Sequence, residues 1–142
     1  MAEALFRQMV HEKLDCPVLV SSGGTHADIG APAASEAVAV MRKLGLSIEE
    51  HRARQLTAES LADADLVLTM TASHKRFLNE KYPHLAGRVF TVKEYAKQLE
   101  GMDIKDPFGQ GLDVYSLVAD ELQESLELII GRLQAKLCTD FV

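Results

Sequence analysis

The sequence predicts an α/β fold in which helices cover a parallel sheet. Short β-rich runs alternate with helical patterns along the chain, the arrangement typical of this fold class. One run, at 65–70, is almost continuously apolar between polar ends, as in a strand buried on both faces. The length of 142 residues suits one domain and leaves little room for a second.

The elements follow in order. Residues 1–14 place apolar side chains at helical spacing, with no capping residue at the start. Gly45 and Pro83 end two of the later helices. The expected helices cover 1–14, 32–46, a short segment from Thr57, 72–81, 93–99 and 113–137. The expected strands cover 17–22, 65–70 and 88–92, and 101–112 is expected to be a loop.

Composition excludes several classes of protein. The 15 Lys and Arg against 21 Asp and Glu give a net charge of −6, unlike a nucleic-acid-binding protein, although a local basic pocket remains possible. No apolar run approaches the roughly 20 residues that span a bilayer, and residues 1–7 do not resemble a secretory signal. We therefore expect a cytoplasmic protein that binds neither nucleic acid nor membrane.

Only Cys16 and Cys138 are present, too few for a disulfide framework. A thiolate that attacks phosphorus needs backbone N–H groups and an arginine around the phosphate, usually in the pattern Cys-x5-Arg. Six positions after Cys16 stands Ser22, and Cys138 lies too near the end of the sequence. Both are interpreted as structural or solvent-side thiols. No His, Cys or carboxylate cluster has metal-ligand spacing, so neither a metal nor another cofactor is expected.

Asp106-Pro107-Phe108-Gly109 is a candidate site for acid catalysis. Proline restricts the backbone of Asp106 and so fixes how the carboxyl is presented. An aromatic ring two residues later could shield the carboxyl and raise its pKa, as a general acid needs. The alternative is an ordinary Asp-Pro turn in which Phe108 fills the core.

Three further stretches have open interpretations. Ser22-Gly23-Gly24-Thr25 is a phosphate-cradling turn or a plain glycine turn, since it lacks the spacing of a P-loop. His51-Arg52-Ala53-Arg54 is an anion site or a solvated charge run. His74-Lys75-Arg76 indicates an exposed basic face on a helix.

Taken in order, these fragments resemble the low-molecular-weight protein-tyrosine-phosphatase family, including its bacterial arginine-phosphatase branch. The matching stretches are Met1-Ala2-Glu3-Ala4-Leu5-Phe6, Ser22-Gly23-Gly24-Thr25, His51-Arg52-Ala53-Arg54-Gln55-Leu56-Thr57, Ala64-Asp65-Leu66-Val67-Leu68-Thr69-Met70-Thr71, Phe90-Thr91-Val92-Lys93-Glu94-Tyr95 and Asp106-Pro107-Phe108-Gly109. The resemblance implies a three-layer α/β/α domain whose first strand lies centrally in the sheet.

The same resemblance contains a departure. Members of the family open with a strand and a loop of the pattern Cys-x-Gly-Asn-x-Cys-Arg-Ser-Pro, directly before Met-Ala-Glu, and this sequence begins at that Met. We therefore expect residues 1–142 to form a single domain, incomplete at its N-terminus, without the first strand, the nucleophilic Cys and the phosphate loop.

The resemblance also implies roles for four residues. Asp106 matches the general acid, Phe108 matches a residue lining the substrate slot, and Ser22 and His51 match residues that hydrogen-bond the phosphate-loop Asn. The implied substrate is a phosphorylated protein or a small phosphomonoester.

Two functions stay open. The first is a protein phosphatase that hydrolyses phosphotyrosine or phosphoarginine through a cysteinyl-phosphate, inactive in this chain because nucleophile and loop are absent. The second is a non-catalytic remnant that serves as a binding or regulatory module. In either case, unpaired strands favour self-association.

Overall fold

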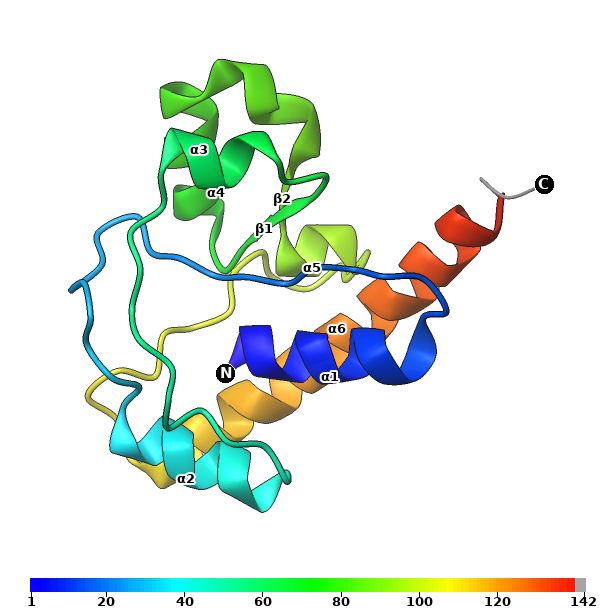
Figure 1. Cartoon of the computed structure of the whole chain (residues 1–142). Helices are drawn as coiled ribbons and strands as arrows, with labels where there is room; N and C mark the ends of the chain where they lie inside the picture. Colours follow the sequence, from blue (N-terminus) through cyan, green and yellow to red (C-terminus); the bar gives the residue numbers. More distant parts are fainter. Residues whose placement is uncertain (140–142) are drawn as a thin grey trace.

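The computed structural model describes residues 1–139, an α/β arrangement with one short sheet (Figure 1). The helices are α1 (Ala2–Lys13), α2 (Ser35–Lys43), α3 (Ala58–Ala62), α4 (Ala72–Lys81), the 3₁₀ helix η1 (Pro83–Arg88), α5 (Val92–Tyr95) and α6 (Leu112–Thr139). The strands are β1 (Val67–Thr69) and β2 (Val89–Thr91).

The sheet separates two apolar clusters. β1 and β2 pair in parallel, with Val67 opposite Val89 and Leu68 opposite Phe90. Because side chains alternate between the faces of a strand, Val67 and Val89 pack with the smaller cluster, while Leu68 and Phe90 pack against the larger one. The smaller cluster is built from α3, α4 and η1, and the larger from α1, α2, α5 and α6. The expected layering of helices on both faces of a parallel sheet is confirmed.

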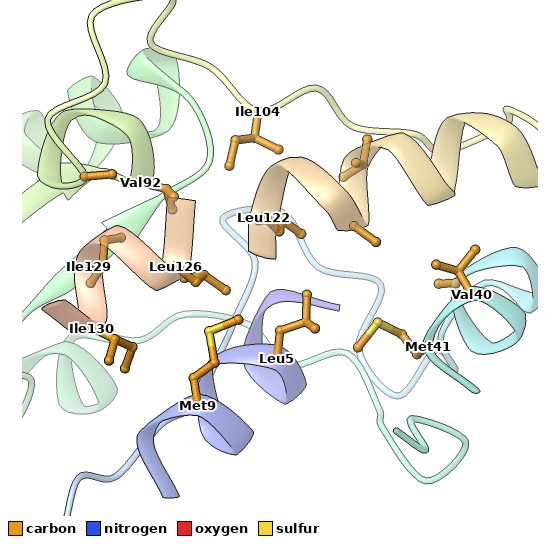
Figure 2. Close-up of a cluster of buried hydrophobic side chains, with 14 of the residues drawn as sticks. Leu5, Met9, Val40, Met41, Val92, Ile104, Leu122, Leu126, Ile129 and Ile130 are labelled. Carbon is orange, nitrogen blue, oxygen red and sulfur yellow. The ribbon is translucent and has the colours of Figure 1, made fainter. Parts of the chain in front are cut away.

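The larger cluster joins the two ends of the sequence. Figure 2 shows Leu5 and Met9 of α1 directed toward Leu122 and Leu126 of α6, with Met41 of α2 beside them. Polar contacts also join α1 to α6. The Lys13 side chain pairs with Glu127, and the Lys13 carbonyl oxygen accepts a 2.7 Å hydrogen bond from the Gln134 side chain. α1 therefore has a fixed place on α6.

The segment 17–22 is the main correction to the expected fold. The sequence predicted a strand there, but in the described residues it belongs to no sheet, and the sheet has two strands rather than three. Val18 and Val20 are half-buried against the larger cluster while Leu19 is fully exposed, so the alternation of a strand is present. A strand also needs a neighbour for its backbone groups, and alternation alone does not supply one.

Several helices end close to where the sequence placed them. α4 occupies 72–81 as predicted, and its first turn is capped by the Thr71 hydroxyl, which accepts from the His74 N–H at 3.1 Å. Thr57 and Ser60 form a full capping box at α3. α5 is shorter than the predicted 93–99, because Lys97 takes a left-handed conformation, with φ of 57°, just after the helix. Among the described residues, no helix is long and apolar enough to cross a membrane.

Candidate active site

A mostly buried carboxylate at the start of α1 has partners from three segments. Arg7 donates to Glu3 Oε1 at 2.6 Å, the Ser22 hydroxyl donates to Glu3 Oε2, and Arg54 Nη2 lies 3.7 Å from the same oxygen. His51 lies close enough for its charge to act on the carboxyl. We call Glu3, Arg7, Ser22, His51 and Arg54 the Glu3 cluster.

The pKa of Glu3 shows that these partners favour the charged carboxylate. Burial, the largest single effect, pushes this pKa upward. The hydrogen bond from Ser22 and the charges of Arg7, His51 and Arg54 together outweigh burial and hold the pKa below its ordinary value. The carboxyl is thus a charged acceptor at neutral pH, with its side chain only 10% exposed.

Backbone contacts bring the segments of the cluster together. The Gly24 N–H donates to the Arg54 carbonyl oxygen at 2.9 Å, and the Leu56 N–H donates to the Gly24 carbonyl oxygen at 3.0 Å. A Cβ on Gly23 would lie 2.8 Å from the Leu56 side chain, so glycine permits this close approach. The turn at Ser22-Gly23-Gly24-Thr25 therefore serves chain pairing.

The second part of the site is a turn around Asp106. Asp106 Oδ1 accepts the Phe108 N–H at 3.0 Å, the Gln110 N–H donates to the Pro107 carbonyl oxygen at 2.9 Å, and Gly109 has a φ of 77°. Pro107 is buried while Asp106 is exposed. The proline anchors the turn and leaves the carboxyl open to solvent.

Phe108 corrects both interpretations of this turn. Its ring is 79% exposed, so it does not fill the core, and the carboxyl two residues earlier is exposed rather than shielded. The core position belongs to Pro107 instead. A large exposed ring beside an exposed carboxyl is free to contact another molecule.

The loop before Asp106 is fastened to the end of β1. The Ile104 N–H donates to the Met70 carbonyl oxygen at 2.8 Å, and Asp103 Oδ1 accepts the Ala72 N–H at 2.7 Å in the first turn of α4. Ile104 is buried in the larger cluster (Figure 2). The carboxyl end of a parallel strand is where open α/β sheets place their sites, so Asp106 emerges at a suitable edge.

Asp106 also acts on α6. Burial raises the pKa of Tyr115, and the charges of Glu36 and Asp106 raise it further. Tyr115 is thereby a neutral, buried phenol near the base of the turn.

The structure brings some predicted residues together and leaves others apart. Ser22 and His51 both lie around Glu3, and Asp106 and Phe108 share one turn. Within residues 1–139, no hydrogen bond or ion pair joins the turn to the cluster. Sequence reasoning missed Glu3 and Arg7. Met1-Ala2-Glu3 enters the sequence-based prediction only as part of the family resemblance.

The basic stretches separate into two kinds. Arg54 pairs with Glu3, whereas Arg52 donates to the carbonyl oxygens of Glu49 and His51, both at 2.8 Å. On α4, Lys75 pairs with Glu94 at 2.8 Å, while His74 and Arg76 are exposed. The exposed basic face predicted for α4 is therefore present in part.

Cys16 is half-buried and free in the turn after α1, and the side chain of Cys138 lies outside the described ones. No group of three or more potential metal-ligating side chains occurs in the part of the chain that the structure describes.

Comparison with known proteins gives a consistent result. A family model for the low molecular weight phosphotyrosine protein phosphatase matches residues 1–139. The protein-arginine-phosphatase of Bacillus subtilis is 36% identical over 134 residues, covering 94% of this chain and 87% of the relative. The probable low molecular weight protein-tyrosine-phosphatase EpsP of Ralstonia nicotianae is 35% identical over 135 residues, covering 95% of this chain and 87% of the relative.

Solved structures agree. A YwlE mutant from Bacillus subtilis superimposes with a TM-score of 0.87 at 34% identity, covering 94% of this chain and 88% of that one. A low molecular weight protein tyrosine phosphatase from T. tengcongensis gives 0.86 at 42% identity, covering 92% and 88%. The chain thus belongs to the low molecular weight phosphotyrosine protein phosphatase family.

Proposed function

We propose that this chain serves the hydrolysis of phosphorylated protein, with Asp106 as the group that handles the proton. The main support is the turn at Asp106, which holds an exposed carboxylate near the carboxyl end of β1. The chain that carries this turn belongs to a phosphatase family. The two candidate substrates are phosphoarginine and phosphotyrosine, because one similar protein is named a protein-arginine-phosphatase and another a probable protein-tyrosine-phosphatase.

The proposed chemistry has two steps. A thiolate attacks phosphorus, the bond from phosphorus to the leaving nitrogen or oxygen breaks, and Asp106 gives its proton to that leaving atom. Water then attacks phosphorus, the phosphorus–sulfur bond breaks, and the Asp106 carboxylate takes the proton of that water. A covalent intermediate has support in a YwlE arginine phosphatase, solved as a Cys→Ser mutant with a phosphorylated active-site serine.

We further propose that residues 1–142 alone do not hydrolyse phosphorylated substrates. Neither Cys16 nor Cys138 is followed by an arginine six positions later, so the sequence holds no Cys-x5-Arg loop. General acid catalysis contributes about 10²–10⁴-fold, short of the roughly 10⁶-fold or more expected of an enzyme. In this proposal the family's first strand would lie between 17–22 and β1, and residues 1–142 are one domain lacking it.

The remaining site residues take supporting roles in the proposal. Ser22 and His51 would hydrogen-bond the phosphate loop, and the exposed ring of Phe108 would line the substrate slot. Their placement supports this, because Ser22 and His51 converge at the start of α1.

An extended chain tests the proposal. A β-strand and a loop of the pattern Cys-x-Gly-Asn-x-Cys-Arg-Ser-Pro are fused ahead of Met1, and the product is assayed with p-nitrophenyl phosphate, arginine-phosphorylated protein and tyrosine-phosphorylated peptide. We expect turnover by the extended chain and none by residues 1–142. An extended variant with Ser for the added nucleophilic Cys is the matched control and should be inactive.

The other outcomes are informative. Turnover by residues 1–142 that Cys16→Ser or Cys138→Ser abolishes would show that the thiols were misjudged. A folded extended chain without turnover, together with saturable binding of phosphorylated protein by residues 1–142, would favour the non-catalytic binding module.

A further inference from the structure

The segment 17–22 has two backbone edges, and one of them is occupied. The segment is extended, since Val18 and Val20 are half-buried against the larger cluster while Leu19 between them is fully exposed. In an extended chain, the N–H and carbonyl groups of successive residues point to opposite edges. Arg7 donates to the Val20 carbonyl oxygen at 2.9 Å, so the Arg7 side chain lies at the edge that Val18 and Val20 share.

The opposite edge is formed by Pro17, Leu19 and Ser21. Among residues 1–139, no hydrogen bond involves the backbone of these three residues, and all three are exposed. The segment also contains none of the charged side chains with which natural edge strands discourage pairing. Pro17 stands at its first position, where a strand tolerates proline. This edge is therefore a template for another strand, with free N–H donors at Leu19 and Ser21.

The segment is complementary to a second copy of itself. Val18, Leu19 and Val20 form a short apolar run, as in strands that are covered on both faces. Charge selects the direction of pairing, because like charges directly opposite each other are destabilising. In a parallel pair in register, Asp15 would face Asp15 of the second copy. In an antiparallel pair centred on Leu19, Asp15 faces the uncharged Gly23 instead.

We propose that residues 17–22 are an interface for a second copy of this chain, with the two segments antiparallel about a two-fold axis at Leu19. The Leu19 N–H of each copy donates to the Leu19 carbonyl oxygen of the other, and the Ser21 N–H donates to the Pro17 carbonyl oxygen of the other. The two exposed Leu19 side chains then pack against each other. Because both copies use the same surface, the assembly closes at a dimer. The inference does not rest on the proposed function, and residues 1–142 suffice to test it.

The first experiment measures the dimer dissociation constant of residues 1–142 by sedimentation velocity. Ser21→Pro removes the Ser21 N–H and with it half of the hydrogen bonds between the copies, so it should weaken the dimer about tenfold or more. Ser21→Ala is the matched control, because it keeps the N–H and should leave the dissociation constant unchanged. Circular dichroism checks that both variants are folded. A parent chain that stays monomeric up to about 1 mM, or a dimer that Ser21→Pro does not weaken, overturns the proposal.

The second experiment places a thiol on the two-fold axis. Leu19→Cys is made in a chain that also carries Cys16→Ser and Cys138→Ser, and is kept in a buffer with oxidised glutathione. Opposite residues in a hydrogen-bonded antiparallel pair have Cα atoms about 5.5 Å apart, within the range that a disulfide spans. Leu19→Cys should therefore form covalent dimers at least about tenfold faster than Leu99→Cys, a second fully exposed leucine position outside the segment.

Equal crosslinking rates for the two cysteine variants would overturn the proposal. If the chains associate but Leu19→Cys does not crosslink, the copies meet at another surface, such as the open edge of β1, and the proposed pairing is wrong. Species larger than dimers would likewise contradict a closed two-fold pair.

Discussion

The Glu3 cluster and the Asp106 turn position their side chains in different ways. In the cluster, charged and hydroxyl groups from α1, 20–22 and 51–54 converge on one carboxylate. In the turn, the Asp106 carboxylate accepts the Phe108 N–H beside a buried proline, and the nearby Asp103 and Ile104 are bound to the start of α4 and the end of β1.

The cluster is positioned mainly by charged groups, whereas the turn is positioned by the ring of Pro107 and by hydrogen bonds of the backbone. Contacts in the cluster depend on the protonation state of Glu3, and they join residues far apart in the sequence. The turn also has contacts between backbone groups, from the Gln110 N–H to the Pro107 carbonyl oxygen and from the Ile104 N–H to the Met70 carbonyl oxygen, which do not depend on protonation. Changes of pH should therefore disturb the cluster first, whereas substitutions near Asp106 should act on the acid function and on α4.

The largest expected effect is on the acid function. Asp106→Ala in the extended chain should lower kcat about 10²–10⁴-fold, because general acid catalysis is lost, with little change in residues 1–142. Lys105→Ala, at the exposed neighbouring position, is the control. If the extended Asp106→Ala chain kept the full kcat, Asp106 would be part of an ordinary Asp-Pro turn with no role in catalysis.

The next largest effect is expected at 17–22, the segment that contains Ser22, and along β1. Hydrogen exchange should be at least about tenfold faster at 17–22 and along β1 than in α6 at 113–137. Residues 17–22 belong to no sheet and β1 is paired along one edge only, so both open locally, while α6 lies in the larger cluster. Sedimentation should show association that grows with concentration, through the open strand edges. A monomer that unfolds sharply and protects 17–22 strongly would contradict both expectations.

A smaller effect is expected where the Asp106 loop meets α4. Asp103→Ala removes the acceptor of the Ala72 N–H and should lower the free energy of unfolding by about 0.5–2 kcal/mol, measured in urea. Asp103→Asn keeps an acceptor oxygen and should cost less. Glu100→Ala, at an exposed position of the same loop, should have no effect beyond error.

The smallest effect is the pH dependence of the cluster. The folded-state pKa of Glu3 lies below the unfolded value of about 4.5, so its contribution is present above that pH and is lost as the pH falls through the folded pKa. The free energy of unfolding should therefore fall more steeply below pH 4.5 in the parent chain than in Glu3→Gln. Glu12→Gln should follow the parent, and identical curves for parent and Glu3→Gln would show that the cluster does not stabilise the fold.

The sequence predicts well those features that depend on neighbouring residues. α4 was placed at its observed bounds because the Thr71 cap and the stop near Pro83 are local signals. The prediction failed at 17–22, since whether an alternating segment is a strand depends on a partner elsewhere. Glu3 was missed for a similar reason. Its hydrogen-bond partner Ser22 lies 19 residues away, so no local spacing marks it.

The packing of α1 on α6 has a consequence for the order of synthesis. Leu5 and Met9 emerge from the ribosome before their partners Leu122 and Leu126, which come more than a hundred residues later. At about 5–20 residues per second, the apolar stripe of α1 stays uncovered for roughly 6–23 s. During that time it is a binding surface for any chaperone that recognises amphipathic helices, and the larger cluster can close only when α6 arrives.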